Sequence, residues 1–288
     1  GWEVRLSGAK GRGLFATRDF RIGECILSEA PLVVGIRRWW GAWAALAAVA
    51  AVGWLFAGPG ESLFSWAYRC TALIMAKPAV FACYEALRLC ASTRVLPPHE
   101  RGQYLGLYSG LPRYLPALSE LRIYRLNAVL GHEAGCVCAT VSMVNHSCHP
   151  NAAFSWSAGI GHQEAQVHAL RAIARGEEIA ASYIDLWQTT EVRLRALRRA
   201  LGFECDCRSC TAPAVERRRS DDRRARCREL ETRVHAELQR NRMPEAREAL
   251  RELRDTAREE LGRVGNLITQ EMDRSLAELE GVAPTAEG

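Results

Sequence analysis

The chain has 288 residues, of which 48% are hydrophobic and 25% charged, and a formal net charge of +5. That length allows one substantial core with a smaller helical appendage, since domains commonly span about 100–200 residues. The modest charge does not require a nucleic-acid partner. Eleven cysteines, an odd number in so long a chain, exclude a small secreted disulfide scaffold. We therefore expect free thiols and a reducing compartment, the cytoplasm or the nucleus.

Short apolar runs alternate with turn residues between Trp2 and Val34. Gly11 and Gly13 frame the first turn before Leu14-Phe15-Ala16, and Arg21-Ile22-Gly23-Glu24 forms the next turn. Apolar stretches of this length between turn signals are typical of β-strands. We expect small strands joined by tight turns.

Residues 39–57 form an uncharged stretch rich in alanine and tryptophan. Its length fits a membrane span. However, alanine and glycine add little hydrophobicity, and the stretch closes at Gly58-Pro59-Gly60, so we favour a buried helix over membrane contact. Residues 62–92 and 99–130 look helical in parts, with a break at Pro97-Pro98.

The pattern of apolar residues and turn residues changes in the second half of the chain. Between residues 139 and 184, β-rich segments alternate with turns, which predicts a compact and mostly β unit. A short basic helix is expected over residues 186–200. From about residue 220 to 279, apolar positions recur at helical spacing, with a break at Pro244. Two or more charged helices should pack there.

Three thiols fall within six residues in the motif Cys205-x-Cys207-x-x-Cys210. A closed structural zinc site needs four ligands. Zinc is the stronger interpretation of this clustering, but one ligand is missing locally. Either Cys148 or the pair Cys136-x-Cys138 could supply it, and the spacing alone does not choose between them.

Four motifs occur in a fixed order along the chain. They are Lys10-Gly11-Arg12-Gly13-Leu14-Phe15-Ala16-Thr17, Asn145-His146-Ser147-Cys148-His149-Pro150-Asn151, Gly176-Glu177-Glu178-Ile179-x-x-Ser182-Tyr183-Ile184-Asp185, and Gly202-Phe203-Glu204-Cys205-x-Cys207-x-x-Cys210. Together they resemble the SET-domain family of protein-lysine methyltransferases, in particular its SET-and-MYND branch. The resemblance covers about residues 1–35 and 120–212.

The resemblance implies an α+β fold of small curled β-sheets, in which the chain around Asn145 and the chain around Tyr183 thread together like a knot. It implies five segments. They are the N-terminal part of the SET domain (1–35), a mostly helical insert (36–120), the C-terminal SET core (121–186), a zinc-binding post-SET segment (187–212) and a C-terminal helical region (220–280).

The resemblance also implies a site for the methyl donor S-adenosylmethionine. Glycines at positions 11 and 13 let the backbone approach a ligand, while Lys10 and Arg12 could pair with the donor's carboxylate. The donor-contacting residues that the family suggests are Lys10, Arg12, Gly13, Leu14, Asn127, Asn145, His146, Tyr183 and Phe203. In this branch the cysteine of the Asn-His-Ser-Cys motif joins the three downstream, so Cys148, Cys205, Cys207 and Cys210 would hold a structural Zn²⁺.

Tyr183 is the expected catalytic residue, because its hydroxyl can orient the substrate amine for an in-line displacement. Such a reaction depends on proximity and alignment more than on acid–base groups. The predicted function is transfer of a methyl group to a lysine of a protein or peptide, histone or otherwise, by a monomeric enzyme.

The chain departs from the family pattern in two places. No run of paired cysteines and histidine marks a MYND zinc module after residue 35, where the apolar stretch 39–57 stands instead. Leu201 occupies a position where relatives often carry a tyrosine that lines the lysine channel. This second departure favours an alternative, a SET-fold binding module with weakened catalysis. A membrane-anchored form of either protein is a third, weaker hypothesis.

Overall fold

The computed structural model describes residues 1–34, 87–109, 116–130, 135–159, 162–262 and 266–280. The chain divides into two compact units. The first comprises Gly1–Ser28, Met143–Ser157 and Gln166–Gly288, and the second comprises Glu29–Ser142 and Ala158–Ala165.

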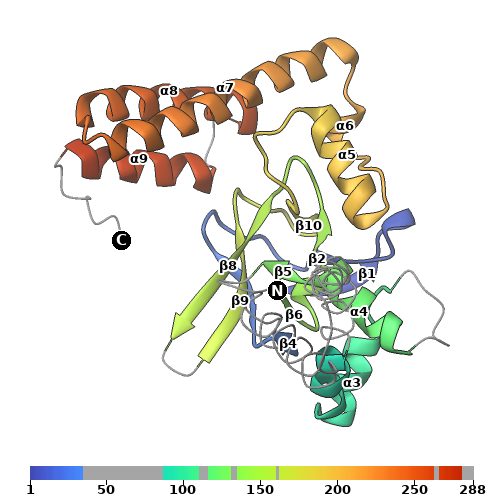
Figure 1. Cartoon of the computed structure of the whole chain (residues 1–288). Coiled ribbons are helices and arrows are strands. Elements are labelled where there is room, and N and C mark those ends of the chain that lie inside the picture. The colour runs from blue at the N-terminus through green and yellow to red at the C-terminus, as the bar shows by residue number, and fades with distance from the viewer. Residues whose placement is uncertain (35–86, 110–115, 131–134, 160–161, 263–265, 281–288) are drawn as a thin grey trace, which may run out of the picture. The chain divides into compact units, whose positions relative to one another are not determined.

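A four-stranded sheet in the first unit brings distant segments together. Its order is β1 (Trp2–Leu6), β2 (Arg12–Ala16), β10 (Glu178–Ala181) and β7 (Asn145–His146). β2 lies antiparallel to both β1 and β10, whereas β10 and β7 run parallel, with Ala180 opposite Asn145 and Ala181 opposite His146. Three of the four sequence motifs therefore meet in one small sheet (Figure 1).

The inward-facing residues of this sheet follow the two-residue period of β-strands. Leu14 and Ala16 on β2 are buried, as are Ile179 and Ala181 on β10. The turn into β2 passes through the short 3-10 helix Gly8–Lys10 and then Gly11, whose φ of 82° is costly for any residue with a side chain. A second sheet has the order β3 (Cys25–Glu29), β9 (His162–Ala169) and β8 (Ala152–Gly159).

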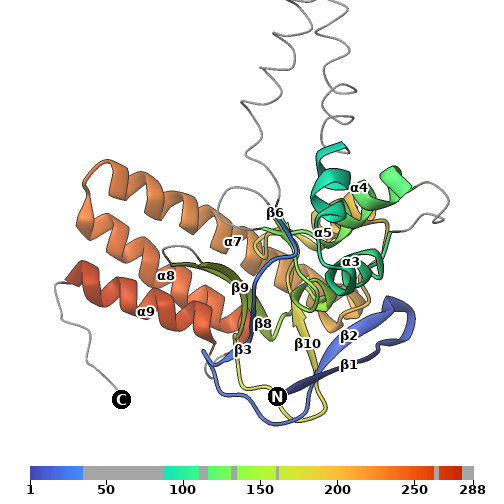
Figure 2. The same ribbon diagram turned by 90° about the horizontal axis from the view of Figure 1, so that it is seen from below.

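Five helices follow the strands of the first unit. They are α5 (Thr190–Leu201), α6 (Arg208–Thr211), α7 (Ala214–Gln239), α8 (Met243–Leu261) and α9 (Leu267–Glu280). Figures 1 and 2 show α7, α8 and α9 side by side, and their apolar faces share one core with Trp187. Helices were expected here, although α7 begins before the predicted boundary at residue 220.

The second unit contains α3 (Pro98–Leu105), α4 (Pro116–Asn127) and helical residues at 87–94. A three-stranded sheet has the order β4 (Val33–Val34), β6 (Gly135–Val137) and β5 (Val129–Leu130). The buried hydroxyl of Tyr104 on α3 donates to the Glu120 carbonyl of α4 over 2.8 Å, which fastens the two helices.

These small sheets with accompanying helices confirm the predicted α+β class. The apolar stretch 39–57 lies outside the described residues. Among the residues that are described, no helix is both long and apolar enough to cross a membrane.

The core of α7, α8 and α9 gives a first prediction. Leu230 on α7 is 0% exposed, so Leu230→Ala should lower the free energy of unfolding by about 2–5 kcal/mol through lost burial and a residual cavity. Leu238 on the same helix is 36% exposed, and Leu238→Ala should cost about 1 kcal/mol or less. Urea denaturation of both variants measures the difference, and equal losses would contradict this packing.

Candidate functional site

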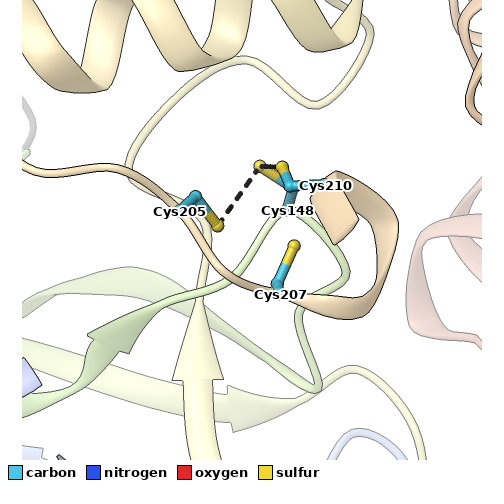
Figure 3. A group of neighbouring side chains, drawn as sticks. All are labelled: Cys148, Cys205, Cys207 and Cys210. Carbon is cyan, nitrogen blue, oxygen red and sulfur yellow. Dashed lines mark hydrogen bonds between the residues drawn. The ribbon is translucent and has the colours of Figure 1, made fainter. Parts of the chain in front are cut away.

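Four cysteines from separate parts of the first unit converge (Figure 3). The sulfurs of Cys148, Cys205, Cys207 and Cys210 all lie within 4.8 Å of one another. Cys148 Sγ is 3.6 Å from the Cys210 sulfur and 4.0 Å from the Cys205 sulfur. A tetrahedral ion with bonds of about 2.3 Å requires sulfurs about 3.8 Å apart. The donor set and its spacing therefore fit a closed zinc site.

Local backbone geometry explains how the three C-terminal cysteines face one point. α5 ends at Leu201, and the φ of 76° at the next residue, Gly202, reverses the chain toward the cluster. Cys207 then starts the short helix α6, and its carbonyl accepts hydrogen bonds from the amides of Cys210 and Thr211 at 2.9 and 3.0 Å. This tight turn places Cys210 one helical turn from Cys207.

Cys148 is the fourth member, so the structure chooses between the two sources that the spacing left open. Cys136 and Cys138 belong to the second unit, where their sulfurs lie 3.9 Å apart. Cys148 follows β7 directly, so the cluster joins the segment after α5 to the Asn-His-Ser-Cys motif.

The four thiols shift one another's pKa in opposite directions, lowering the pKa at Cys205 and Cys207 and raising it at Cys148 and Cys210. Hydrogen bonds from the thiols of Cys148, Cys207 and Cys210 lower the pKa of Cys205. A buried arginine on α5, Arg193, is 1% exposed. Burial lowers the pKa of Arg193, but its charge interaction and hydrogen bond with Cys148 outweigh this effect and the pKa is raised. A cation thus stands beside the sulfur cluster.

His146 connects this cluster to Tyr183. The Tyr183 amide donates to His146 Nδ1 over 3.0 Å, and His146 Nε2 lies 3.3 Å from Cys148 Sγ. The ring centroids of His146 and Tyr183 are 5.2 Å apart, and Phe154 stacks on Tyr183 at 6.5 Å. The tyrosine is therefore held between two rings and tied through its backbone to β7.

Tyr183 is 37% exposed, but its hydroxyl is hydrogen-bonded to the backbone. It donates to the Val144 carbonyl over 2.5 Å. Burial of the hydroxyl, with a smaller contribution from the negative charge of Glu178, raises the pKa of Tyr183. The phenol is therefore neutral at physiological pH and acts as a hydrogen-bonding group rather than as a base.

Asn145 lies against the glycine turn. Its Nδ2 donates to Glu178 Oε1 over 2.8 Å and to the Arg12 carbonyl over 3.3 Å. A Cβ at Gly13 would lie 2.6 Å from each of these two side-chain atoms, so only glycine fits. At the other end of the same motif, the buried Asn151 donates to the Glu178 carbonyl and accepts from the Ala180 amide, both over 2.8 Å.

The remaining predicted residues are distributed as follows. Lys10 pairs at 3.2 Å with Asp206, which stands between Cys205 and Cys207 in the sequence. Leu14 is fully buried in β2. Phe203 packs against the cysteine cluster with its ring 6.0 Å from that of His146. Asn127 belongs to the second unit, where its amide donates to the carbonyls of Tyr108 and Ile123, each over 2.7 Å.

Leu201, the position of the second departure, is partly buried and packs against the cysteine cluster. Sequence reasoning missed Glu178, Arg193 and the Val144 carbonyl as partners of the site. Glu178 stood inside a recognised motif, but nothing marked its contact with Asn145. Arg193 was one of several basic residues in a predicted helix, and nothing in the sequence distinguished it as a neighbour of the cysteine cluster.

The family model for the SET domain matches residues 11–184, more than half of the chain. The chain therefore belongs to the SET-domain family, as the four motifs predicted.

Among similar proteins, N-lysine methyltransferase SMYD2 of Gallus gallus is 34% identical over 125 residues, covering 43% of this chain and 27% of that protein. SMYD2-B of Danio rerio is 40% identical over 88 residues, covering 28% and 19%. The chain thus matches about a quarter or less of the length of these relatives. The crystal structure of the SET domain of LSMT bound to lysine and AdoHcy overlaps 70% of this chain and 52% of that one, with a TM-score of 0.36 and 14% identity. An overlap at this level supports no conclusion about this chain, whose family assignment comes from the family model.

The contact between Gly13 and Asn145 gives a second prediction. Gly13→Ala must displace either the Asn145 amide or the Glu178 carboxylate, and we expect a loss of about 1–3 kcal/mol of stability, seen as a lower Tm by circular dichroism. Gly102→Ala is the control, because a Cβ there meets nothing within 4 Å and alanine favours the helix. An unchanged Tm for Gly13→Ala would mean that the close approach is not rigid.

Proposed function

We propose that this protein transfers a methyl group from S-adenosylmethionine to a lysine side chain of a protein or peptide. One observation carries the proposal: Tyr183 is fixed by its hydroxyl to the carbonyl of Val144, just before β7, and by its amide to His146 on β7. Membership of the SET-domain family and the names of the SMYD2 relatives support the same reaction.

The donor would lie along Gly13, Asn145 and His146, with Phe203 beside the histidine. S-adenosylmethionine supplies a methyl group on a positively charged sulfonium. The chain supplies a surface without a side chain at Gly13, amide groups at Asn145, and positive charge at Lys10 and Arg12. Lys10 pairs with Asp206, so the carboxylate end of the donor would compete with Asp206 for the Lys10 ammonium.

Tyr183 would orient the substrate amine. Because its hydroxyl proton is given to the Val144 carbonyl, the lone pairs of its oxygen remain to accept a hydrogen bond from that amine. A neutral amine held in this way presents its own lone pair for an in-line displacement. The rate of methyl transfer would then come mainly from the alignment of the amine with the methyl group. No base with a lowered pKa is required at Tyr183.

The four-cysteine cluster would hold Zn²⁺ in a structural role. Four thiolates fill all four positions of a tetrahedral ion and leave none for substrate. The ion would tie the segment after α5 to Cys148, and therefore to His146 two residues earlier. Reduced thiols are required, so we propose the cytoplasm or the nucleus as the compartment.

A third prediction tests the tyrosine. Tyr183→Phe removes the oxygen that accepts from the amine, and methyl transfer from labelled donor to a peptide mixture should fall about 100-fold while donor affinity is retained. Tyr108→Phe is the matched control, because Tyr108 is 68% exposed and, within the part of the chain that the structure describes, only its backbone carbonyl forms a hydrogen bond. Unchanged transfer by Tyr183→Phe would contradict its role.

A fourth prediction tests the metal. The purified chain should contain about one zinc per molecule by elemental analysis. Cys148→Ala should lose the ion together with donor affinity, because the same loop carries Asn145 and His146. Cys227→Ala should keep both, since Cys227 is buried in the helical core instead. A zinc-free parent chain that still folds and binds donor would overturn the assignment.

A SET-fold binding module with weakened catalysis is the second candidate function. Leu201 favours it, because this apolar side chain packs against the cysteine cluster and offers no hydroxyl to a substrate lysine. Donor binding by a zinc-loaded chain with no methyl transfer to any peptide would support this function over the first.

A further inference from the structure

A buried arginine on α7 links the C-terminal helices to both segments of the site. Arg224 is 0% exposed. Its Nε donates to Glu260 Oε1 on α8 over 2.7 Å and to Ser220 Oγ over 3.3 Å. The other Glu260 oxygen accepts from Arg223 Nε over 2.9 Å. The positive charge of Arg224 is therefore paired within the helices, with a carboxylate that it shares with Arg223.

The two remaining nitrogens of Arg224 donate away from the helices. Nη2 donates to the Cys148 carbonyl over 2.9 Å, and Nη1 donates to the Leu186 carbonyl. Cys148 comes two residues after His146, and Leu186 comes three residues after Tyr183. One guanidinium thus joins the end of the Asn-His-Ser-Cys segment to the end of the tyrosine segment.

The chemistry of a guanidinium makes this link rigid. Its five N–H groups lie in one plane with fixed directions, so the two carbonyls cannot shift independently while both bonds persist. A buried carbonyl that lost its donor would need another partner. Lysine could not replace the arginine, because a single ammonium cannot span Glu260 and both carbonyls.

We propose that Arg224 is a positioning residue for methyl transfer, which holds the donor segment and the tyrosine segment in register from the C-terminal helices. This inference rests on the proposed function. It gives α7 and α8 a part in the chemistry although neither carries a residue of the site.

The rival explanation is that Arg224 only fastens α7 to α8. Arg226, two residues along α7, provides the comparison. Its Nε and Nη2 donate to Glu252 on α8 over 2.9 and 2.6 Å, and its Nη1 donates to Glu229 over 2.7 Å. Among the described residues, the hydrogen bonds of Arg226 all lie within α7 and α8, and none reaches a segment of the site.

The test compares three variants of the full chain with the parent. Arg224→Lys keeps the charge but loses the fork of donors. The double variant Arg224→Met with Glu260→Met removes both buried charges, and apolar replacement of such a pair is often neutral or stabilising. Arg223 also loses Glu260, but its side chain is 32% exposed and can be solvated, so the helices should remain folded. Arg226→Lys is the control. Each protein is measured for helix content, for zinc, for affinity toward S-adenosylhomocysteine by calorimetry, and for amide exchange over residues 145–149 and 183–187.

Both Arg224 variants should keep their helix content and bind S-adenosylhomocysteine roughly tenfold more weakly or worse, as is typical for loss of a supporting contact. Their amides in the two segments, including Ser147 and Tyr183, should exchange about tenfold faster through local opening. Arg226→Lys should match the parent in both measurements.

Parent-like affinity and exchange in the Arg224 variants would overturn the proposal and leave the proposed function standing. Loss of helix content in both Arg224 variants would also overturn it, because Arg224 would then be a structural residue of the helices. If the parent itself bound no donor, the proposed function would fail, and the exchange measurement, which needs no ligand, would still decide whether Arg224 orders the two segments.

Discussion

The parallel pairing of β7 with β10 is the contact on which the site depends. It sets Asn145 opposite Ala180 and His146 opposite Ala181, and it brings Tyr183, two residues beyond β10, beside the His146 ring. Asn151 reinforces the pairing, because its buried amide satisfies backbone groups of Glu178 and Ala180. A two-residue strand would be weak alone, and these side-chain bonds hold it in place.

Two further constraints act on the same loop from different directions. The cysteine cluster holds Cys148 by its sulfur, through thiols supplied by the segment after α5. Arg224 holds Cys148 by its carbonyl, through a helix of the C-terminal region. Side chain and backbone of one residue are thus fastened to different elements, and the position of His146 follows from both.

Motif chemistry could be predicted because it is local in sequence. Cys205, Cys207 and Cys210 stand within six residues, so their convergence needs only one tight turn. Gly13 was marked by its lack of a side chain, and the structure shows the approach of Asn145 that requires it. The bond from the Tyr183 hydroxyl to the Val144 carbonyl was not predictable, because it joins residues that are far apart in the chain.

By itself, the sequence determined the family and the α+β class, since short motifs with constrained spacing encode both, and it named the candidate site residues. Spacing left Cys148 and the pair Cys136-x-Cys138 open as the fourth member, the family resemblance implied Cys148, and the structure places Cys148 in the cluster. Tertiary structure alone decided that Glu178 meets Asn145, and that Arg224 rather than its neighbouring arginines is buried against the loop. The physical reason is that these contacts join segments far apart in the chain. An arginine on a helix has the same residue type and the same periodicity whether it lies in solvent or is buried. The sequence therefore does not show which arginine of α7 meets the loop.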